Sequence, residues 1–186
     1  MNLVPTALRG VVIAETHVRG DDRGNFVRLF CSRELVSALG ERRIVQINLS
    51  QTRQPGTIRG LHFQHRPHAE TKLIRCLKGK VWDVAVDLRA GSPTFLRWHA
   101  EELTPDNARM MIVPEGCAHG YQTLAPESEL LYLHTEVHSP EVEDGVAWND
   151  PQLEISWPLP LPQTGGLSDR DRGLPVLAAD FRGVDA

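Results

Sequence analysis

The segment Val81–Leu88, VWDVAVDL, alternates between two kinds of side chain along its length. One set of alternate residues is apolar throughout: Trp82, Val84, Val86 and Leu88. The opposite set includes Asp83, Ala85 and Asp87. Such a period of two is typical of a β-strand whose two faces meet different surroundings. The same period recurs in two further segments, Ile44–Ser50 and Leu130–His138. The sequence therefore predicts several strands with two distinct faces.

Short clusters of glycine and proline separate the alternating segments and indicate turns. Helix signals are few: Ser32 is a candidate cap for a short helix that Gly40 ends, and Thr104–Asn107 is a candidate single turn. Many short strands with few helices are typical of a β-sandwich or barrel. We therefore predict an all-β fold, of the jelly-roll barrel kind that closes its edges and leaves a polar cavity inside.

The composition excludes several classes of protein. The 186 residues suit a single domain, and no repeat or linker divides them. A net charge of −4, from 20 Lys and Arg against 24 Asp and Glu, argues against a nucleic-acid partner. No apolar run approaches the ~20 residues of a membrane span, and the first residues do not form a secretory signal. Three widely spaced cysteines argue against a disulfide framework, so a cytoplasmic location is expected.

The chain has eight histidines, and a metal site is the first hypothesis they raise because imidazole is a common ligand of zinc and iron. Metal-binding cupins usually carry a His-x-His pair followed by Glu, and then Pro-x-Gly-x-x-His. The second pattern is present at Pro114–His119, but the first is missing. His62 and His65 lie three residues apart, which places them on opposite faces of a strand. We therefore predict no bound metal.

His62 has a different environment from the other histidines. Its neighbours Leu61 and Phe63 can point into an apolar layer, which turns His62 toward a cavity. A histidine in a cavity is a candidate general base, because imidazole titrates near neutral pH. A hydrogen-bonded strand histidine without chemistry is the alternative for this residue taken alone.

Six motifs in a fixed order closely resemble the dTDP-4-dehydrorhamnose 3,5-epimerase family. They are RGLHFQ (Arg59–Gln64), KLIRC (Lys72–Cys76), DVAVDLR (Asp83–Arg89), SPTF (Ser92–Phe95), PEGCAHG (Pro114–Gly120) and WNDP (Trp148–Pro151). The resemblance covers about residues 10–172, and we treat residues 1–186 as one domain with a C-terminal tail at 173–186. It implies a metal-free, cupin-like jelly roll that forms homodimers, needs no cofactor and acts on a nucleotide-linked 4-keto-6-deoxyhexose.

The resemblance also implies a set of catalytic residues. A keto group at C4 acidifies the hydrogens at C3 and C5, so inversion needs a base, an acid on the opposite face and a positive group at the enolate oxygen. By their match to the family motifs, His62 is the base and Asp171 orients its imidazole. Lys72 stabilises the enolate, and Tyr132 returns a proton to the opposite face.

Further positions match residues that contact the substrate in the family. Guanidinium groups suit phosphate, and the resemblance assigns Arg23, Arg59 and Arg170 to the pyrophosphate and nucleoside. The remaining matched positions line the substrate: Phe26, Gln46, Asn48, His119 and Glu143.

The sequence departs from the family at the nucleotide end. His138 stands where the family usually has an aromatic residue that stacks on the base, and an imidazole offers less stacking area than a phenol ring. Arg28 stands where the family usually has Glu, and arginine is a donor that cannot accept from a thymine N–H. Two hypotheses follow: the pocket has changed but still takes dTDP, or the carrier nucleotide is another one, such as CDP.

Other functions remain open on the sequence. Relatives with the same catalytic residues invert C3 alone or C5 alone, and ketoisomerisation is possible on the same fold. A metal-dependent cupin oxygenase is disfavoured by the missing His-x-His pair. A non-catalytic sugar-binding module does not need the combination of His62, Lys72, Tyr132 and Asp171.

Overall fold

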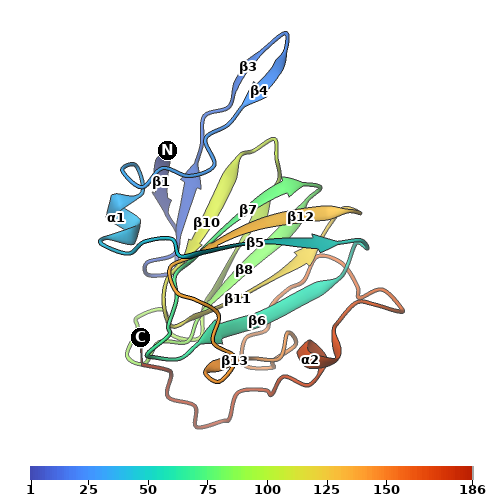
Figure 1. Cartoon of the computed structure of the whole chain (residues 1–186). Helices are drawn as coiled ribbons and strands as arrows, with labels where there is room; N and C mark the ends of the chain where they lie inside the picture. Colours follow the sequence, from blue (N-terminus) through green and yellow to red (C-terminus); the bar gives the residue numbers. More distant parts are fainter. Residues whose placement is uncertain (186) are drawn as a thin grey trace.

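Two antiparallel sheets form the body of the protein, as Figure 1 shows for the computed structural model, which describes residues 1–185. The six-stranded sheet consists, in spatial order, of β1 (Asn2–Pro5), β2 (Val12–Glu15), β10 (Arg109–Val113), β7 (Lys72–Lys78), β12 (Ser128–His134) and β5 (Gln46–Thr52). The five-stranded sheet consists of β13 (Glu143–Gly145), β6 (Ile58–Gln64), β11 (Cys117–Thr123), β8 (Val81–Asp87) and β9 (Trp98–Leu103). A separate hairpin, β3 (Arg19–Asp21) and β4 (Gly24–Phe26), projects away from both sheets (Figure 1).

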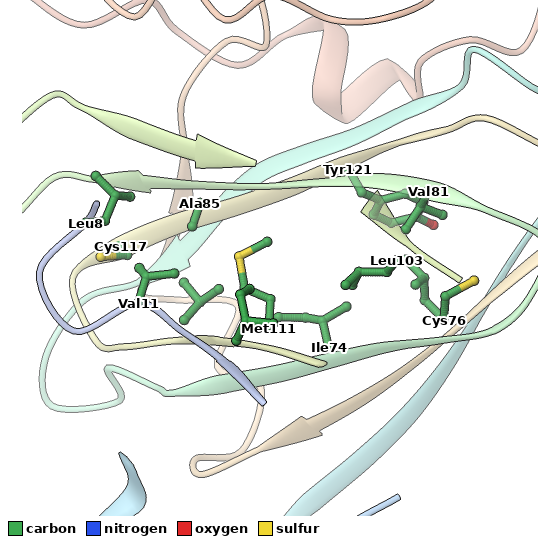
Figure 2. Close-up of a cluster of buried hydrophobic side chains, with 13 residues drawn as sticks. Leu8, Val11, Ile74, Cys76, Val81, Ala85, Leu103, Met111, Cys117 and Tyr121 are labelled. Atoms are coloured by element: carbon green, nitrogen blue, oxygen red, sulfur yellow. The ribbon is translucent and has the colours of Figure 1, made fainter. Parts of the chain in front are cut away.

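The main core lies between the two sheets. Figure 2 shows its side chains filling the space between the ribbons, with Ile74 and Met111 from one sheet and Ala85 and Tyr121 from the other. These residues are at most 2% exposed. Close packing of this kind holds the sheets at a fixed separation, and the partly buried Tyr132 packs against the same cluster.

Each sheet also has an apolar outer layer. Outside the five-stranded sheet, Val84 and Val86 pack with Leu61 and Phe63, and the C-terminal segment covers them through residues such as Phe181. Outside the six-stranded sheet, a second cluster is covered by the segment that contains the first helix; its buried members include Leu35, Leu39, Leu73 and Met110. The two predicted faces are confirmed for Val81–Leu88. Val84 and Val86 lie in the outer layer, whereas Val81 and Ala85 lie in the core between the sheets.

The helices differ from the predicted ones. Helix α1 spans only Val36–Leu39 and has Leu35, not Ser32, at its N-cap, although it ends at Gly40 as predicted. Thr104–Asn107 forms a turn closed by paired side chain–backbone bonds of Thr104 and Asn107 and not a helical turn. Helix α2, Asp169–Arg172, was not predicted. Both helices are only four residues long, and residues 1–185 contain no helix long and apolar enough to cross a membrane.

Two predicted strand boundaries are also wrong. The strand expected over Leu130–His138 ends at His134, because the chain leaves β12 there in a bend. The strand expected from Ile44 begins at Gln46, and Ile44 packs on the outer cluster of the six-stranded sheet. The alternation remains correct within the observed strands.

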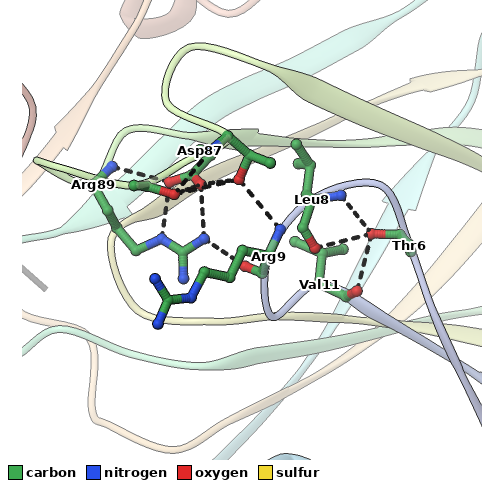
Figure 3. Close-up of polar contacts among 8 residues, drawn as sticks. Thr6, Leu8, Arg9, Val11, Asp87 and Arg89 are labelled. Atoms are coloured by element: carbon green, nitrogen blue, oxygen red, sulfur yellow. Dashed lines mark hydrogen bonds and ion pairs between the residues drawn. The ribbon is translucent and has the colours of Figure 1, made fainter.

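A buried carboxylate braces the end of β8. Asp87 accepts hydrogen bonds from Arg89, Ser92 and Thr94, and Arg89 also donates to the carbonyl of Arg9 (Figure 3). Burial alone raises the pKa of the Asp87 carboxyl, but these hydrogen bonds outweigh it and lower the pKa to about 2. The network therefore ties the loop after β8 to the N-terminal segment.

Candidate active site

A cavity of about 360 Å³ lies where the two sheets and helix α2 meet. Both sheets contribute to its wall: His62 comes from β6 of the five-stranded sheet, and Tyr132 comes from β12 of the six-stranded sheet. The predicted site residues that line it are His62, Lys72, Tyr132, Asp171, Gln46, Asn48, Arg59, His119, His138, Glu143 and Arg170. Most of the residues that sequence reasoning selected are thus brought together.

His62 and Asp171 form a hydrogen-bonded pair inside this cavity. The distance between His62 Nε2 and Asp171 Oδ1 is 2.7 Å, and the Asp171 side chain is only 5% exposed. Since a carboxylate accepts, the proton of the neutral imidazole lies on Nε2 and the lone pair lies on Nδ1. The pair therefore leaves His62 Nδ1 free to act as a base.

Helix α2 holds Asp171 in place. Ser168 caps the helix, and its hydroxyl accepts a hydrogen bond from the backbone N–H of Asp171 at 3.0 Å. Burial alone raises the pKa of the Asp171 carboxyl, but the hydrogen bond and positive charge of His62, with a smaller contribution from Ser168, keep that pKa below its usual value. The S-x-x-D spacing of Ser168–Asp171 is a capping signal that could have predicted this helix from the sequence.

A close approach of β6 and β11 fixes the position of His62 in the cavity. His62 lies opposite His119 on the neighbouring strand, and a bulge follows at Tyr121. A Cβ atom on Gly60 would lie 2.6 Å from the Cα of Gly120, so a side chain at Gly60 would push the two strands apart. Glycine at this point of RGLHFQ thus serves the geometry of the site.

Lys72 is anchored at two points beside His62. Its Nζ donates to the carbonyl of His62 at 3.1 Å and pairs with Glu70 Oε1 at 3.2 Å. The side chain is 11% exposed. An ammonium group carries three N–H donors, so one donor remains for a substrate oxygen.

Tyr132 lies between two imidazole rings. Its ring packs edge-on against His119, with centroids 5.7 Å apart, and stacks on His134 at 5.9 Å. Desolvation raises the pKa of the Tyr132 hydroxyl well above its usual value. The phenol therefore keeps its proton at neutral pH and can act as an acid.

His119 forms a second histidine–carboxylate pair. His119 Nε2 lies 2.8 Å from Asp83 Oδ1, and both side chains are buried. Burial raises the pKa of the Asp83 carboxyl, and the nearby His119 opposes this shift. The pair fixes the ring of His119 at the cavity wall.

The other end of the cavity carries two arginines. Arg59 donates to Thr52 Oγ1 at 3.1 Å, and Arg170 pairs with Glu143 at 2.7 Å. His138 lies 3.7 Å from the same carboxylate and is half exposed. This end is more open to solvent than the enclosed site around Asp171.

Three predicted residues lie outside the cavity of their own chain. Arg23 and Phe26 belong to the projecting β3–β4 hairpin, where Arg23 pairs with Asp21 and Phe26 is 70% exposed. Arg28, just after the hairpin, pairs with Glu34. Within one chain, therefore, these three residues are not brought to His62.

Sequence reasoning missed some residues of the cavity. Glu70, Tyr121, His134 and Ser168 line it without having been selected. Strand alternation could have indicated two of them. Glu70 lies two residues before Lys72 and His134 lies two residues after Tyr132, so each shares a face with a selected residue. Among residues 1–185, no three His, Cys, Asp or Glu side chains gather in a metal-ligating group.

A family model described as dTDP-4-dehydrorhamnose 3,5-epimerase matches residues 5–179 of the chain. The chain belongs to this epimerase family. The resemblance that the six motifs indicated is therefore confirmed, and the enzyme is an isomerase-class epimerase.

Individual relatives of the epimerase are similar over nearly their whole length. The dTDP-4-dehydrorhamnose 3,5-epimerase of Pseudomonas aeruginosa is 44% identical over 176 residues, which cover 92% of this chain and 93% of the relative. A crystal structure of the Bacillus anthracis enzyme with TDP and PPi bound has a TM-score of 0.89 at 42% identity, covering 95% of this chain and 99% of the other. The Legionella pneumophila enzyme, in complex with dTDP-4-keto-L-rhamnose, has a TM-score of 0.89 at 35% identity, covering 100% and 98%. The predicted all-β, cupin-like fold is confirmed.

Proposed function

We propose that this epimerase inverts C3 and C5 of a dTDP-linked 4-keto-6-deoxyhexose, with His62, Lys72, Tyr132 and Asp171 as its catalytic machinery. The observation that carries the proposal is the placement of His62 and Tyr132 on opposing sheets around one cavity. A sugar ring held between them presents one face to a base and the other face to an acid. Inversion of a carbon centre requires this arrangement.

The reaction begins at the carbon next to the keto group. Nδ1 of His62 takes the C3 proton, the C–H electron pair forms the C3–C4 double bond, and the C4 oxygen becomes an enolate. Asp171 stabilises the imidazolium that results, because its carboxylate accepts from Nε2 at 2.7 Å. The remaining N–H of Lys72 donates to the enolate oxygen.

The second half of the reaction takes place on the opposite face. Tyr132 donates its proton to C3 as the carbonyl re-forms, so the carbon is inverted and a tyrosinate remains. Proton exchange with solvent then returns His62 and Tyr132 to their starting states. The same sequence at C5 completes the double inversion, and no cofactor takes part.

Arg59 and Arg170 support binding of the nucleotide diphosphate at the open end of the cavity. Their guanidinium groups line this end, and guanidinium suits phosphate oxygens. His138 then lies beside the base. We propose dTDP as the carrier, since the relatives named above are dTDP-sugar enzymes.

Calorimetry with dTDP, CDP and GDP tests the choice of nucleotide. The proposal predicts that dTDP binds most tightly. Tighter binding of CDP would instead support the second hypothesis drawn from Arg28 and His138. In that case the epimerase chemistry would stand and the carrier would change.

We also propose that the enzyme is a homodimer in which each hairpin reaches the partner's cavity. Strand β5 is an edge strand whose residues Ile47 and Leu49 are 60% and 54% exposed, an apolar strip that a partner would cover. Pairing through this edge gives Phe26 an apolar environment and brings Arg23 to a phosphate. Sedimentation at micromolar concentration should give twice the chain mass, whereas a monomer with full activity would contradict the proposal.

A reducing cytoplasm is the compartment we propose for the enzyme. Its three cysteines are free thiols, and two of them are buried. Burial raises the pKa of the Cys117 thiol to about 12, so this thiol is unreactive.

Solvent deuterium exchange tests the reaction itself. A panel of nucleotide-linked 4-keto-6-deoxyhexoses is incubated with the enzyme in D2O and examined by NMR. We expect deuterium at C3 and C5, and we expect His62→Ala to abolish its uptake. Exchange at full rate in His62→Ala would show that His62 is not the base, and deuterium at one carbon alone would identify a monoepimerase.

A further inference from the structure

A chain of polar side chains crosses three neighbouring strands at one wall of the cavity. Lys72 Nζ lies 3.2 Å from Glu70 Oε1, and Glu70 Oε2 lies 2.6 Å from His134 Nδ1. On the other side of the ring, His134 Nε2 lies 3.4 Å from Asn48 Nδ2. Two residues without a role in the reaction, Glu70 and His134, therefore join the enolate-stabilising lysine to a residue that lines the substrate cavity.

The register of the six-stranded sheet explains why these polar side chains lie next to one another. His134 is the cross-strand partner of Lys72 on one side and of Gln46 on the other, so it lies between the strands that carry Lys72 and Asn48. The side chains of Glu70 and His134 are 8% and 11% exposed. Burial alone raises the pKa of the Glu70 carboxyl, but the His134 hydrogen bond and the charge of Lys72 overcome this and keep the pKa below its usual value. Glu70 is therefore a carboxylate at neutral pH.

The carboxylate determines the tautomer of His134. Because Glu70 can only accept, the proton of the neutral ring lies on Nδ1, and Nε2 carries a lone pair. Nε2 then accepts from the amide nitrogen of Asn48, which leaves the amide oxygen of Asn48 for the substrate. With the opposite tautomer, the amide of Asn48 would have to reverse.

We propose that Glu70 and His134 are positioning residues of the epimerase: Glu70 holds the Lys72 ammonium at the enolate, and His134 determines which end of the Asn48 amide faces the sugar. The proposal rests on the proposed function, because it takes Lys72 as the enolate partner and Asn48 as a substrate contact. It accounts for two buried polar residues that line the cavity and that the reaction itself leaves unused.

Two variants test the Lys72 end and the Asn48 end of this polar network separately. Glu70→Gln keeps the size of the side chain but removes the charge that anchors Lys72, so kcat should fall about tenfold or more. Its amide oxygen can still accept from His134 Nδ1, so KM should stay within twofold. His134→Asn keeps a donor toward Glu70 but loses the partner of Asn48, so KM should rise about threefold or more. Tyr132 loses one stacking ring but keeps its contact with His119, so kcat should change less than KM does. Glu136→Gln is the control, because Glu136 pairs with His68 away from this cavity and should leave both constants unchanged.

Nitrogen-15 NMR of the wild-type imidazoles tests the same network without substrate. The signal lost in His134→Asn identifies His134, and we expect its wild-type form to carry the proton on Nδ1. A proton on Nε2, or unchanged kcat and KM in both Glu70→Gln and His134→Asn, would overturn the proposal. The tautomer is measured on the wild-type enzyme without turnover, so the NMR result distinguishes a failure of this network from a failure of the proposed epimerisation.

Discussion

Replacing Asp171 by asparagine removes one negative charge from beneath the proposed base and little else. Asn has nearly the size of Asp, and its backbone N–H can still donate to Ser168 Oγ at the α2 cap. The change is confined to the bond between His62 Nε2 and Asp171 Oδ1, which is 2.7 Å long and largely shielded from water. The variant thus isolates the contribution of the carboxylate to the base.

The expected loss follows from the strength of that bond. A hydrogen bond to a charged group contributes about 1.5–3 kcal/mol. Because the imidazolium forms as the proton leaves the sugar, this amount is lost from the transition state, and about 1.36 kcal/mol corresponds to a tenfold change in rate. Asp171→Asn should therefore lower kcat about 10- to 150-fold.

The assay is the initial rate of deuterium uptake at C3 in D2O, measured by NMR at saturating substrate. Asp169→Asn is the matched control, because Asp169 lies in the same helical turn, is exposed and should leave the rate unchanged. A melting curve checks that both variants are folded. A rate for Asp171→Asn within twofold of wild type would refute the assignment of Asp171 to the base.

Three further substitutions test other parts of the structure. Lys72→Met removes the donor at the enolate oxygen and should lower kcat about 10²- to 10³-fold in the same assay, whereas a loss below threefold would contradict its role. Tyr132→Phe should slow inversion at least about 10²-fold while deuterium uptake from the His62 face continues, and NMR of the recovered sugar checks this. Asp87→Asn should destabilise the fold by about 2 kcal/mol at pH 7, or about 4–8 °C in Tm, because the pKa of Asp87 falls from 3.8 to about 2 on folding. Since a lowered pKa stabilises the folded state only above the unfolded value, this difference in Tm should disappear as the pH falls from 4 toward 2; a constant difference would contradict it.

Strand parity predicted much of the site from the sequence. Leu61 and Phe63 pack in the outer layer, so His62 between them faces the cavity, as the alternation predicted. Gln46 and Asn48 share a face in the same way. Parity is a local property of the backbone, and tertiary packing left it unchanged in these strands.

The alternation of residues along a strand could not predict long-range contacts or the bounds of short helices. His62 and Asp171 lie 109 residues apart, and only the family motif, not any local pattern, indicated their contact. Ser32 was a plausible cap, but the backbone of Cys31 accepts the first turn's N–H groups and the helix starts later. Arg23 and Phe26 lie on a hairpin that projects away from both sheets, and no local pattern in the sequence indicated this.

The most direct test of the central claim uses the wild-type enzyme with dTDP-4-keto-6-deoxy-D-glucose in D2O. His62 and Tyr132 on opposite faces predict a product inverted at C3 and C5, with solvent deuterium at both carbons. A substrate recovered without deuterium at either carbon would contradict the claim that His62 and Tyr132 form the base and the acid of an epimerase.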